Sequence, residues 1–293
     1  MTESIRPLRS ALFLPASNPR AIEKARGLAC DAVILDLEDA VAPEAKAEAR
    51  DAAVAAVKAG GFRAPTVVVR ANALDTEWGA ADLAALAGCG ADAVLVPKVA
   101  TADDVELYHA ELAAAPKAMA LWVMIETCRA VSELQRIADM AARTRLAVMV
   151  VGTNDLALEL RAKPAVDRAG LLPYLALSVA AARAAGIAVL DGVCNDFSDL
   201  DRFAEECAQG RALGFDGKSL IHPAQIEACN SAFSPDADEV ARARAVIAAF
   251  ADPANAGKGA IRIDGRMAER LHLHEAERVL ALNEAANSWL TGH

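Results

Sequence analysis

Short apolar runs alternate with longer Ala-rich amphipathic segments along most of the chain. The short runs are almost uninterrupted, which is the pattern of strands that are buried on both faces. The expected strands are Ser10–Leu14, Ala32–Leu37, Thr66–Arg70, Ala93–Pro97, Leu121–Ile125, Ala147–Val151, Ile187–Asp191 and Gly217–Ile221. The clearest helical segments between them are Pro19–Leu28, Glu44–Lys58, Ala102–Ala114, Arg129–Ala142 and Pro173–Ala185.

Eight repeats of strand and helix predict a closed (β/α)8 TIM barrel of the α/β class. The alternative is an open doubly wound sheet, but no G-x-G-x-x-G segment follows an early strand. The pattern changes after Pro223. Val240–Phe250 is expected to be a final barrel helix, and a segment rich in turn formers follows at residues 252–259. A short strand, Ala260–Ile263, and a helix, Met267–Asn287, come last. We therefore expect a barrel domain over residues 1–253 and a small C-terminal lid or oligomerisation segment over residues 254–293.

Composition narrows the classes of partner. The formal net charge is −10, and the sequence contains no block of Lys and Arg, so nucleic acid is not an expected partner. No apolar stretch approaches the roughly 20 residues that span a bilayer, and the N-terminus has no apolar signal run. The six cysteines form no C-x-x-C pair and lie in Ala-rich segments, which favours buried, reduced thiols. A cytoplasmic protein without a membrane partner is expected.

Polar residues gather where the expected strands end, which is the edge where barrel enzymes carry their chemistry. Several of them are carboxylates, and these repel one another unless a cation is present. Oxygen ligands of this kind suit Mg²⁺, which takes one or two carboxylates and completes its shell with water and substrate. Glu126 and Asp155 follow adjacent strands and are the natural pair of ligands. The alternative is that each carboxylate only caps the helix that follows it.

Arg70 closes a strand that reads Val-Val-Val-Arg. An Arg in a buried strand needs an anionic partner. That partner is either a substrate carboxylate, gripped by two parallel hydrogen bonds, or a carboxylate of the neighbouring strand, Asp36 or Glu38. The sequence leaves both possibilities open.

The ordered motifs of the chain resemble those of citrate lyase β-subunit-like proteins, among which are malyl-CoA and citramalyl-CoA lyases. The resemblance covers residues 9 to about 280 and is far more specific for the family than for the substrate. The motifs are Arg9-Ser-Ala-Leu-Phe-Leu-Pro15, Leu35-Asp-Leu-Glu-Asp-Ala-Val41, Val69-Arg-Ala-Asn72, Val96-Pro-Lys98, Met124-Ile-Glu-Thr127, Gly152–Asp155, Asp191-Gly192, Gly214-Phe-Asp-Gly-Lys218 and Ile221-His-Pro-Ala-Gln-Ile226.

The resemblance implies a barrel of the phosphoenolpyruvate/pyruvate superfamily that assembles as a homotrimer or hexamer. It implies Mg²⁺ on Glu126 and Asp155, and Arg70 on a substrate carboxylate or carbonyl oxygen. By the same resemblance, the remaining residues expected to be catalytic or to bind substrate and coenzyme A are Asp36, Phe13, Lys24 and Asn154. Core packing for Phe13 and a solvated helix face for Lys24 are the alternatives that the residues alone favour.

Two departures from the family pattern stand out. Some relatives carry an Arg that reaches coenzyme A where this chain has Asn18, which leaves the coenzyme A phosphates to Lys24 and Arg20. Related lyases also carry a lid Asp that reaches the site of a neighbouring subunit as acid or base. Glu269 stands at that position here, one methylene longer, and the Pro that follows in relatives is absent. A helix-surface Glu is the alternative for Glu269.

The leading expectation is reversible Claisen-type cleavage of a malyl-CoA-like or citramalyl-CoA-like thioester. Its products are a small 2-oxo acid and an acyl-CoA, with the metal and Arg70 stabilising charge on oxygen and Glu269 protonating carbon. Three alternatives stay open. They are hydrolysis of a (3S)-malyl-CoA-type thioester at the same site, a β subunit acting on a carrier-protein thioester inside a complex, and a catalytically silent relative that only binds ligand.

Overall fold

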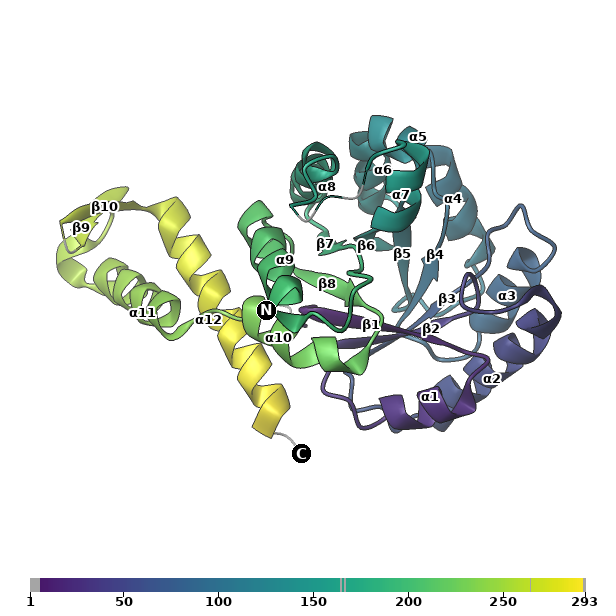
Figure 1. Ribbon diagram of the computed structural model, residues 1–293. Coiled ribbons are helices and arrows are strands. Elements are labelled where there is room, and N and C mark those ends of the chain that lie inside the picture. The colour runs from purple at the N-terminus through teal and green to yellow at the C-terminus, as the bar shows by residue number, and fades with distance from the viewer. Residues whose placement is uncertain (1–5, 164, 166, 264, 292–293) are drawn as a thin grey trace. The chain divides into compact units, whose positions relative to one another are not determined.

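The structure is a computed structural model that describes residues 6–163, 165, 167–263 and 265–291 (Figure 1). It contains two compact units, one over residues 8–233 and one that holds the described residues from 234 onward with residues 6 and 7. The first unit contains the whole barrel. The helix expected as the last barrel helix, α11 (Ala237–Ala251), is grouped with the second unit.

Eight parallel strands close into a barrel in the order of the sequence, as predicted. All eight expected strands are present, with bounds that differ by one residue or so. They are β1 (Ser10–Pro15), β2 (Ala32–Asp36), β3 (Thr66–Arg70), β4 (Ala93–Val96), β5 (Ala120–Ile125), β6 (Leu146–Val151), β7 (Ala188–Asp191) and β8 (Gly217–Leu220).

Alternate residues of the strands fill two separate apolar layers. Ile34, Val68 and Leu95 belong to a smaller cluster in the barrel interior, whereas Val33, Val69 and Val94 pack in the larger layer between strands and helices. Burial on both faces explains why most of the strands are apolar runs without polar alternation. In these strands, polar side chains are left to the ends, whereas β8 carries Lys218 and Ser219 in its interior.

The helices of the barrel unit surround the sheet (Figure 1). They are α1 (Pro19–Ala25), α2 (Lys46–Ala59), α3 (Gly79–Leu86), α4 (Ala102–Glu111), α5 (Cys128–Ser132), α6 (Leu134–Asp139), α7 (Thr153–Glu159), α8 (Leu172–Ala185), α9 (Leu200–Leu213) and α10 (Ile226–Ala232). In the described residues, no helix is both long enough and apolar enough to cross a bilayer.

The helix expected over Arg129–Ala142 is interrupted. It is divided into α5, α6 and a 3-10 turn, Met140–Ala142, with Glu133 at φ −115° between the two α-helices. The Ser132 hydroxyl donates to the Arg129 carbonyl at 2.7 Å, a local bond that competes with continuation of the helix.

The second unit contains α11, a hairpin of β9 (Ala260–Ile263) and β10 (Arg266–Glu269), and α12 (Arg270–Thr291). The expected strand at Ala260–Ile263 is confirmed. The last helix begins at Arg270 and not at Met267, because Met267 pairs with Arg262 in the hairpin. Gly265, at φ 80°, supplies the left-handed backbone of the turn.

Candidate active site at the carboxyl ends of the strands

A cavity of about 360 Å³ lies at the carboxyl ends of the barrel strands. This is the face where barrel enzymes carry their chemistry. Residues from β1, β2, β3, β5, β6 and β8 and from the segments that follow them contribute to it. The lining residues are Phe13, Leu14, Pro15, Asp36, Asp39, Ala40, Arg70, Met124, Glu126, Val151, Gly152, Thr153, Asn154, Asp155, Val193, Ser219 and Ile221.

Glu126 and Asp155 lie on the cavity wall and share one cation. Glu126 follows β5 and its side chain is 3% exposed, whereas Asp155, in the first turn of α7, is 36% exposed. The ammonium of Lys98 lies 3.5 Å from Glu126 Oε1 and forms an ion pair with Asp155 Oδ2. The two carboxylates predicted as a pair are therefore close enough to bind one positive charge.

Gly152 leaves the space that Glu126 occupies. A Cβ at residue 152 would lie 2.5 Å from both Cβ and Oε2 of Glu126, closer than real side-chain contacts allow. The Lys98 amide also donates to Glu126 Oε1 at 2.8 Å. Packing on one side and a hydrogen bond on the other hold this carboxylate in one position.

Arg70 lies in the same cavity, and its partner is the carboxylate of the neighbouring strand. Parallel pairing of β2 with β3 sets Asp36 directly opposite Arg70. Nε and Nη2 of Arg70 donate to the two oxygens of Asp36, each at 2.6 Å. Nη1 lies 2.8 Å from Glu38 Oε2. The sequence left open whether Arg70 pairs with a substrate carboxylate or with a carboxylate of the neighbouring strand. In the structure it pairs with the neighbouring strand, and these bonds hold the guanidinium rigidly.

Phe13 lies beneath this guanidinium. The Arg70 Cζ is 4.9 Å from the centroid of the Phe13 ring, a cation–π contact. Phe13 is half-buried and lines the cavity, so it is more than a core residue. Together, Asp36 and Phe13 fix the orientation of Arg70.

Glu38 has an unusual acidity. Burial raises the pKa of Glu38 to about 7, against the lowering effect of Arg70, and the negative charges of Asp39 and Glu126 add to the rise. Arg70 stays charged, because hydrogen bonding and attraction from Asp36 raise its pKa in spite of its burial. Glu38, which is paired with Arg70, is therefore expected to change its charge near neutral pH.

The other predicted site residues are Lys24, Asn154 and Glu269. Lys24 is exposed on α1 and does not line the cavity. Asn154 lines the cavity but is exposed, and its side chain exchanges two hydrogen bonds with Asn195, at 3.2 and 2.7 Å. Glu269 is half-buried in β10 of the second unit, where its amide donates to His272 Nδ1 at 2.9 Å.

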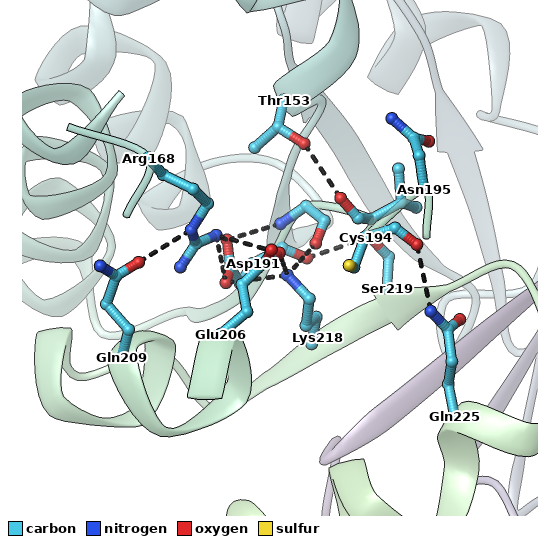
Figure 2. Close-up of polar contacts among 12 residues, drawn as sticks. Thr153, Arg168, Asp191, Cys194, Asn195, Glu206, Gln209, Lys218, Ser219 and Gln225 are labelled. Atoms are coloured by element: carbon cyan, nitrogen blue, oxygen red, sulfur yellow. Dashed lines mark hydrogen bonds and ion pairs between the residues drawn. The ribbon is translucent and has the colours of Figure 1, made fainter. Parts of the chain in front are cut away.

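A second charged group, which the sequence analysis missed, is buried beside the end of β7 (Figure 2). We call Arg168, Asp191, Glu206 and Lys218 the buried cluster. Arg168 Nη1 lies 2.8 Å from both oxygens of Asp191, and Lys218 Nζ lies 3.1 Å from Asp191 Oδ2 and 2.6 Å from Glu206 Oε1. Lys218 is 0% exposed. The available signal was a Lys within the expected strand Gly217–Ile221, because a fully buried Lys is almost always paired.

The buried cluster and its neighbours hold the segment that follows β7. Three successive carbonyl groups each accept a hydrogen bond from a side chain (Figure 2). The Gly192 carbonyl accepts from Lys218 Nζ, that of Val193 from Thr153 Oγ1 at 3.4 Å, and that of Cys194 from Gln225 Nε2 at 3.1 Å. Because Val193 lines the cavity and Asn195 contacts Asn154, this segment forms one side of the candidate site.

Comparison with known proteins agrees with this geometry. Residues 9–223 match the HpcH/HpaI aldolase/citrate lyase family. The chain belongs to this family. It is 45% identical to (3S)-malyl-CoA thioesterase of Cereibacter sphaeroides, with 97% of this chain and 98% of the relative covered. It is 35% identical to citrate lyase subunit beta of Escherichia coli, with 95% and 94% covered.

Solved structures of family members support the same fold. CitE from Mycobacterium tuberculosis, in complex with magnesium, acetoacetate and coenzyme A, is 33% identical to this chain with a TM-score of 0.74, and 94% of this chain and 97% of that one are covered. The citrate lyase beta subunit of M. tuberculosis, in complex with oxaloacetate and magnesium, is 34% identical with a TM-score of 0.66 and covers 78% of this chain and 98% of that one. The resemblance read from the motifs and the barrel fold are both confirmed.

The donor set at the cavity fits a magnesium ion. Mg²⁺ requires oxygen ligands, uses few carboxylates and keeps water or substrate in its remaining positions. Glu126 and Asp155 provide two carboxylates that already bind one cation, the Lys98 ammonium. Among the described residues, no group of three or more His, Cys, Asp or Glu side chains converges on one point. Two carboxylates leave the remaining positions of such an ion to water and substrate.

Proposed function

We propose that this chain is a Mg²⁺-dependent enzyme that hydrolyses a malyl-CoA-like thioester. The products would be the free carboxylic acid and coenzyme A, with one water consumed. The relative that is 45% identical along almost its whole length is named (3S)-malyl-CoA thioesterase, which favours hydrolysis. A structural relative binds magnesium and coenzyme A together, which supports the same cofactor and the same class of ligand here.

The observation that carries the proposal is one cavity with two kinds of charge on its wall. Glu126 and Asp155 share a cation on one side, and Arg70 is fixed by Asp36 on the other. We propose Glu126 and Asp155 as the residues that hold the metal. The bound metal would act as a Lewis acid for the oxygen atoms of the substrate.

The residues of the chain would then orient the substrate. Glu126 is buried and accepts the Lys98 amide, so it would fix the position of bound ligand relative to the strands. Arg70 is held by Asp36 and Phe13, and it presents positive charge at a constant place. Preorganised charge of this kind stabilises a developing negative charge without a cost of reorganisation during the reaction.

Three residues are candidates for contact with the coenzyme A part of the substrate. Phe13 and Asn154 line the cavity, and we propose both as contacts of the thioester or of the pantetheine arm. Lys24 is a solvated lysine on α1, and we propose that it meets the phosphates of coenzyme A in solution.

Cleavage of the carbon–carbon bond is the second candidate. The named citrate lyase relatives and the carboxylate of Glu269 favour it, because a lyase needs a group that protonates the carbanion product. We propose that residues 254–293 act as a lid and that Glu269 serves the site of another chain in a homotrimer or hexamer. In this reaction a 2-oxo acid leaves together with an acyl-CoA.

One assay separates the two reactions. Purified protein is incubated with (3S)-malyl-CoA and Mg²⁺, and free thiol and 2-oxo acid are measured in the same sample. Free thiol without 2-oxo acid identifies hydrolysis, and 2-oxo acid without free thiol identifies the lyase. EDTA should abolish either activity. Glu126→Gln should lower the rate by at least about a hundredfold, which is typical of losing a metal ligand or its partner.

The control variant is Asp103→Asn, an exposed carboxylate of α4. It should leave the rate within about twofold of the wild-type protein, as expected of a surface substitution. If neither product forms from malyl-CoA or citramalyl-CoA, both candidate functions are wrong. If EDTA leaves the rate unchanged, the metal assignment is wrong.

A further inference from the structure

Lys98 has an unusual position at the end of β4. It is one of three residues other than Gly with positive φ in the described part of the chain, and its φ is 55°. A left-handed backbone is strained for a residue with a Cβ, so its surroundings must favour it. Here the conformation lets one residue contact Glu126 twice, through its amide at 2.8 Å and its ammonium at 3.5 Å.

The ammonium of Lys98 binds the same two carboxylates that we propose for the metal. It lies against Glu126 Oε1 and pairs with Asp155 Oδ2. Two neighbouring carboxylates repel each other, and a cation between them offsets that repulsion. Mg²⁺ and the ammonium would therefore compete for the same oxygens.

Of the two groups that meet at Glu126 Oε1, Lys98 is the one that can move away. The Glu126 side chain is 3% exposed and accepts the Lys98 amide, whereas the Lys98 side chain is 41% exposed. A lysine with this exposure can swing into solvent without opening the core. We expect metal entry to displace the ammonium and to leave Glu126 in place.

Charge balance gives the displaced ammonium a new partner. The three side chains together carry one net negative charge before a metal binds. After Mg²⁺ enters they carry one net positive charge, which a single ligand carboxylate would neutralise. Arg70 keeps its own partners, Asp36 and Glu38, so the Lys98 ammonium is the cation that loses its partners when the metal binds.

We propose that Lys98 is a built-in counterion of the metal site that couples the binding of Mg²⁺ to the binding of an anionic ligand. Before the metal binds, its ammonium holds the two carboxylates together. When Mg²⁺ displaces it, the ammonium pairs with the carboxylate of the incoming ligand, so that metal and ligand strengthen the binding of each other. This proposal rests on the metal site of the proposed function.

The test is titration calorimetry with Mg²⁺ alone and with Mg²⁺ in saturating oxaloacetate. In the wild-type protein, oxaloacetate should tighten Mg²⁺ binding by about tenfold, within the usual range of coupling between sites. Lys98→Met should bind Mg²⁺ alone about tenfold more tightly than wild type, because the competing charge is gone. Oxaloacetate should then add less than about threefold, because the released ammonium is missing.

The matched control is Lys117→Met, which removes an exposed lysine just before β5, at the opposite end of the strands. It should behave like the wild-type protein. Lys98→Asn repeats the measurement with a residue that tolerates the left-handed backbone, in case Met disturbs the fold. A loss of structure cannot produce tighter Mg²⁺ binding, so this readout separates the counterion role from a merely structural one.

The contrary results are distinct. If both Lys98 variants bind Mg²⁺ as wild type does, with the same response to oxaloacetate, Lys98 is not the counterion although the metal site stands. If no protein in the series binds Mg²⁺, the proposed metal site itself is wrong, and the role of Lys98 is wrong with it.

Discussion

Two groups of charged side chains in the barrel differ in how far their lysines are exposed to solvent. In the buried cluster, Lys218 is 0% exposed and has two carboxylates, Asp191 and Glu206, within 3.1 Å. At the mouth of the barrel, Lys98 is 41% exposed and faces Glu126 and Asp155. Both lysines bridge two acidic groups, but only one of them can exchange its place with water or with another cation.

The difference separates a structural role from a binding role. Lys218 cannot leave without abandoning charges inside the protein, whereas Lys98 can leave at little cost. The buried cluster also holds the Gly192 carbonyl, so its rigidity extends to the wall of the cavity. The buried cluster is thus a fixed arrangement of charge that supports the site. The group of Lys98, Glu126 and Asp155 is an exchangeable arrangement within the site.

The largest expected effect is the loss of the buried cation. Lys218→Met should lower the free energy of unfolding by about 3–5 kcal/mol, because Asp191 and Glu206 lose a partner in the interior. Lys98→Met should lower it by less than about 1 kcal/mol, as for an exposed ion pair. Urea unfolding measures both, with Lys117→Met as the control. If both substitutions lower the free energy of unfolding equally, the distinction between the buried cluster and the group around Lys98 is wrong.

The metal itself should stabilise the mouth. At about a hundred times its dissociation constant, Mg²⁺ should raise the free energy of unfolding by about 2.7 kcal/mol, because it binds the folded chain alone. Glu126→Gln should show no such increase, whereas the same measurement on Asp103→Asn should match the wild-type protein. Thermal unfolding with and without EDTA reports the difference. An increase that survives in Glu126→Gln would place the ion elsewhere.

Glu38 should make the stability of the folded chain depend on pH. Burial raises its pKa from 4.5 to about 7, so the folded chain keeps a proton that the unfolded chain has released. Raising the pH through this window therefore favours unfolding. Glu38→Gln cannot release a proton, and its stability relative to wild type should rise by on the order of 2–3 kcal/mol between pH 4.5 and 7. Urea unfolding at several pH values measures this. A difference that stays constant over this window contradicts the raised pKa.

Much of the barrel was predictable because its strands are buried on both faces. Most strands are short apolar runs, and polar residues at their ends pointed to the functional edge, so Asp36, Arg70, Glu126 and Asp155 were predicted from their positions. The structure places all four along one cavity. The division between the barrel and the C-terminal segment was less accessible. The chain changes compact unit at Ser234, ahead of the turn-rich segment at residues 252–259 that suggested a boundary.

Pairings between distant residues were not predictable from one sequence. The partner of Arg70 depends on the register of β2 against β3, which sets Asp36 opposite it. The buried cluster draws Arg168 from a loop, Glu206 from α9 and Lys218 from β8, and no local pattern joins them. The role of Lys98 depends on one left-handed backbone angle, for which its residue type gives no signal.

The smallest expected effect tests whether the fixed arrangement supports the site. Thr153 donates to the Val193 carbonyl at 3.4 Å and lies two residues before Asp155. Thr153→Val keeps the shape of the side chain and removes the hydrogen bond, so the free energy of unfolding should fall by about 0.5–1 kcal/mol. A slightly displaced Val193 should weaken substrate binding, with KM for the thioester about threefold higher and kcat within about twofold. Thr144→Val, ahead of β6, removes a bond to the Met140 carbonyl at 2.7 Å and one from the Leu146 amide at 3.3 Å, and it should leave KM unchanged. If both variants raise KM alike, the effect is general loosening, and the segment after β7 has no special part in binding.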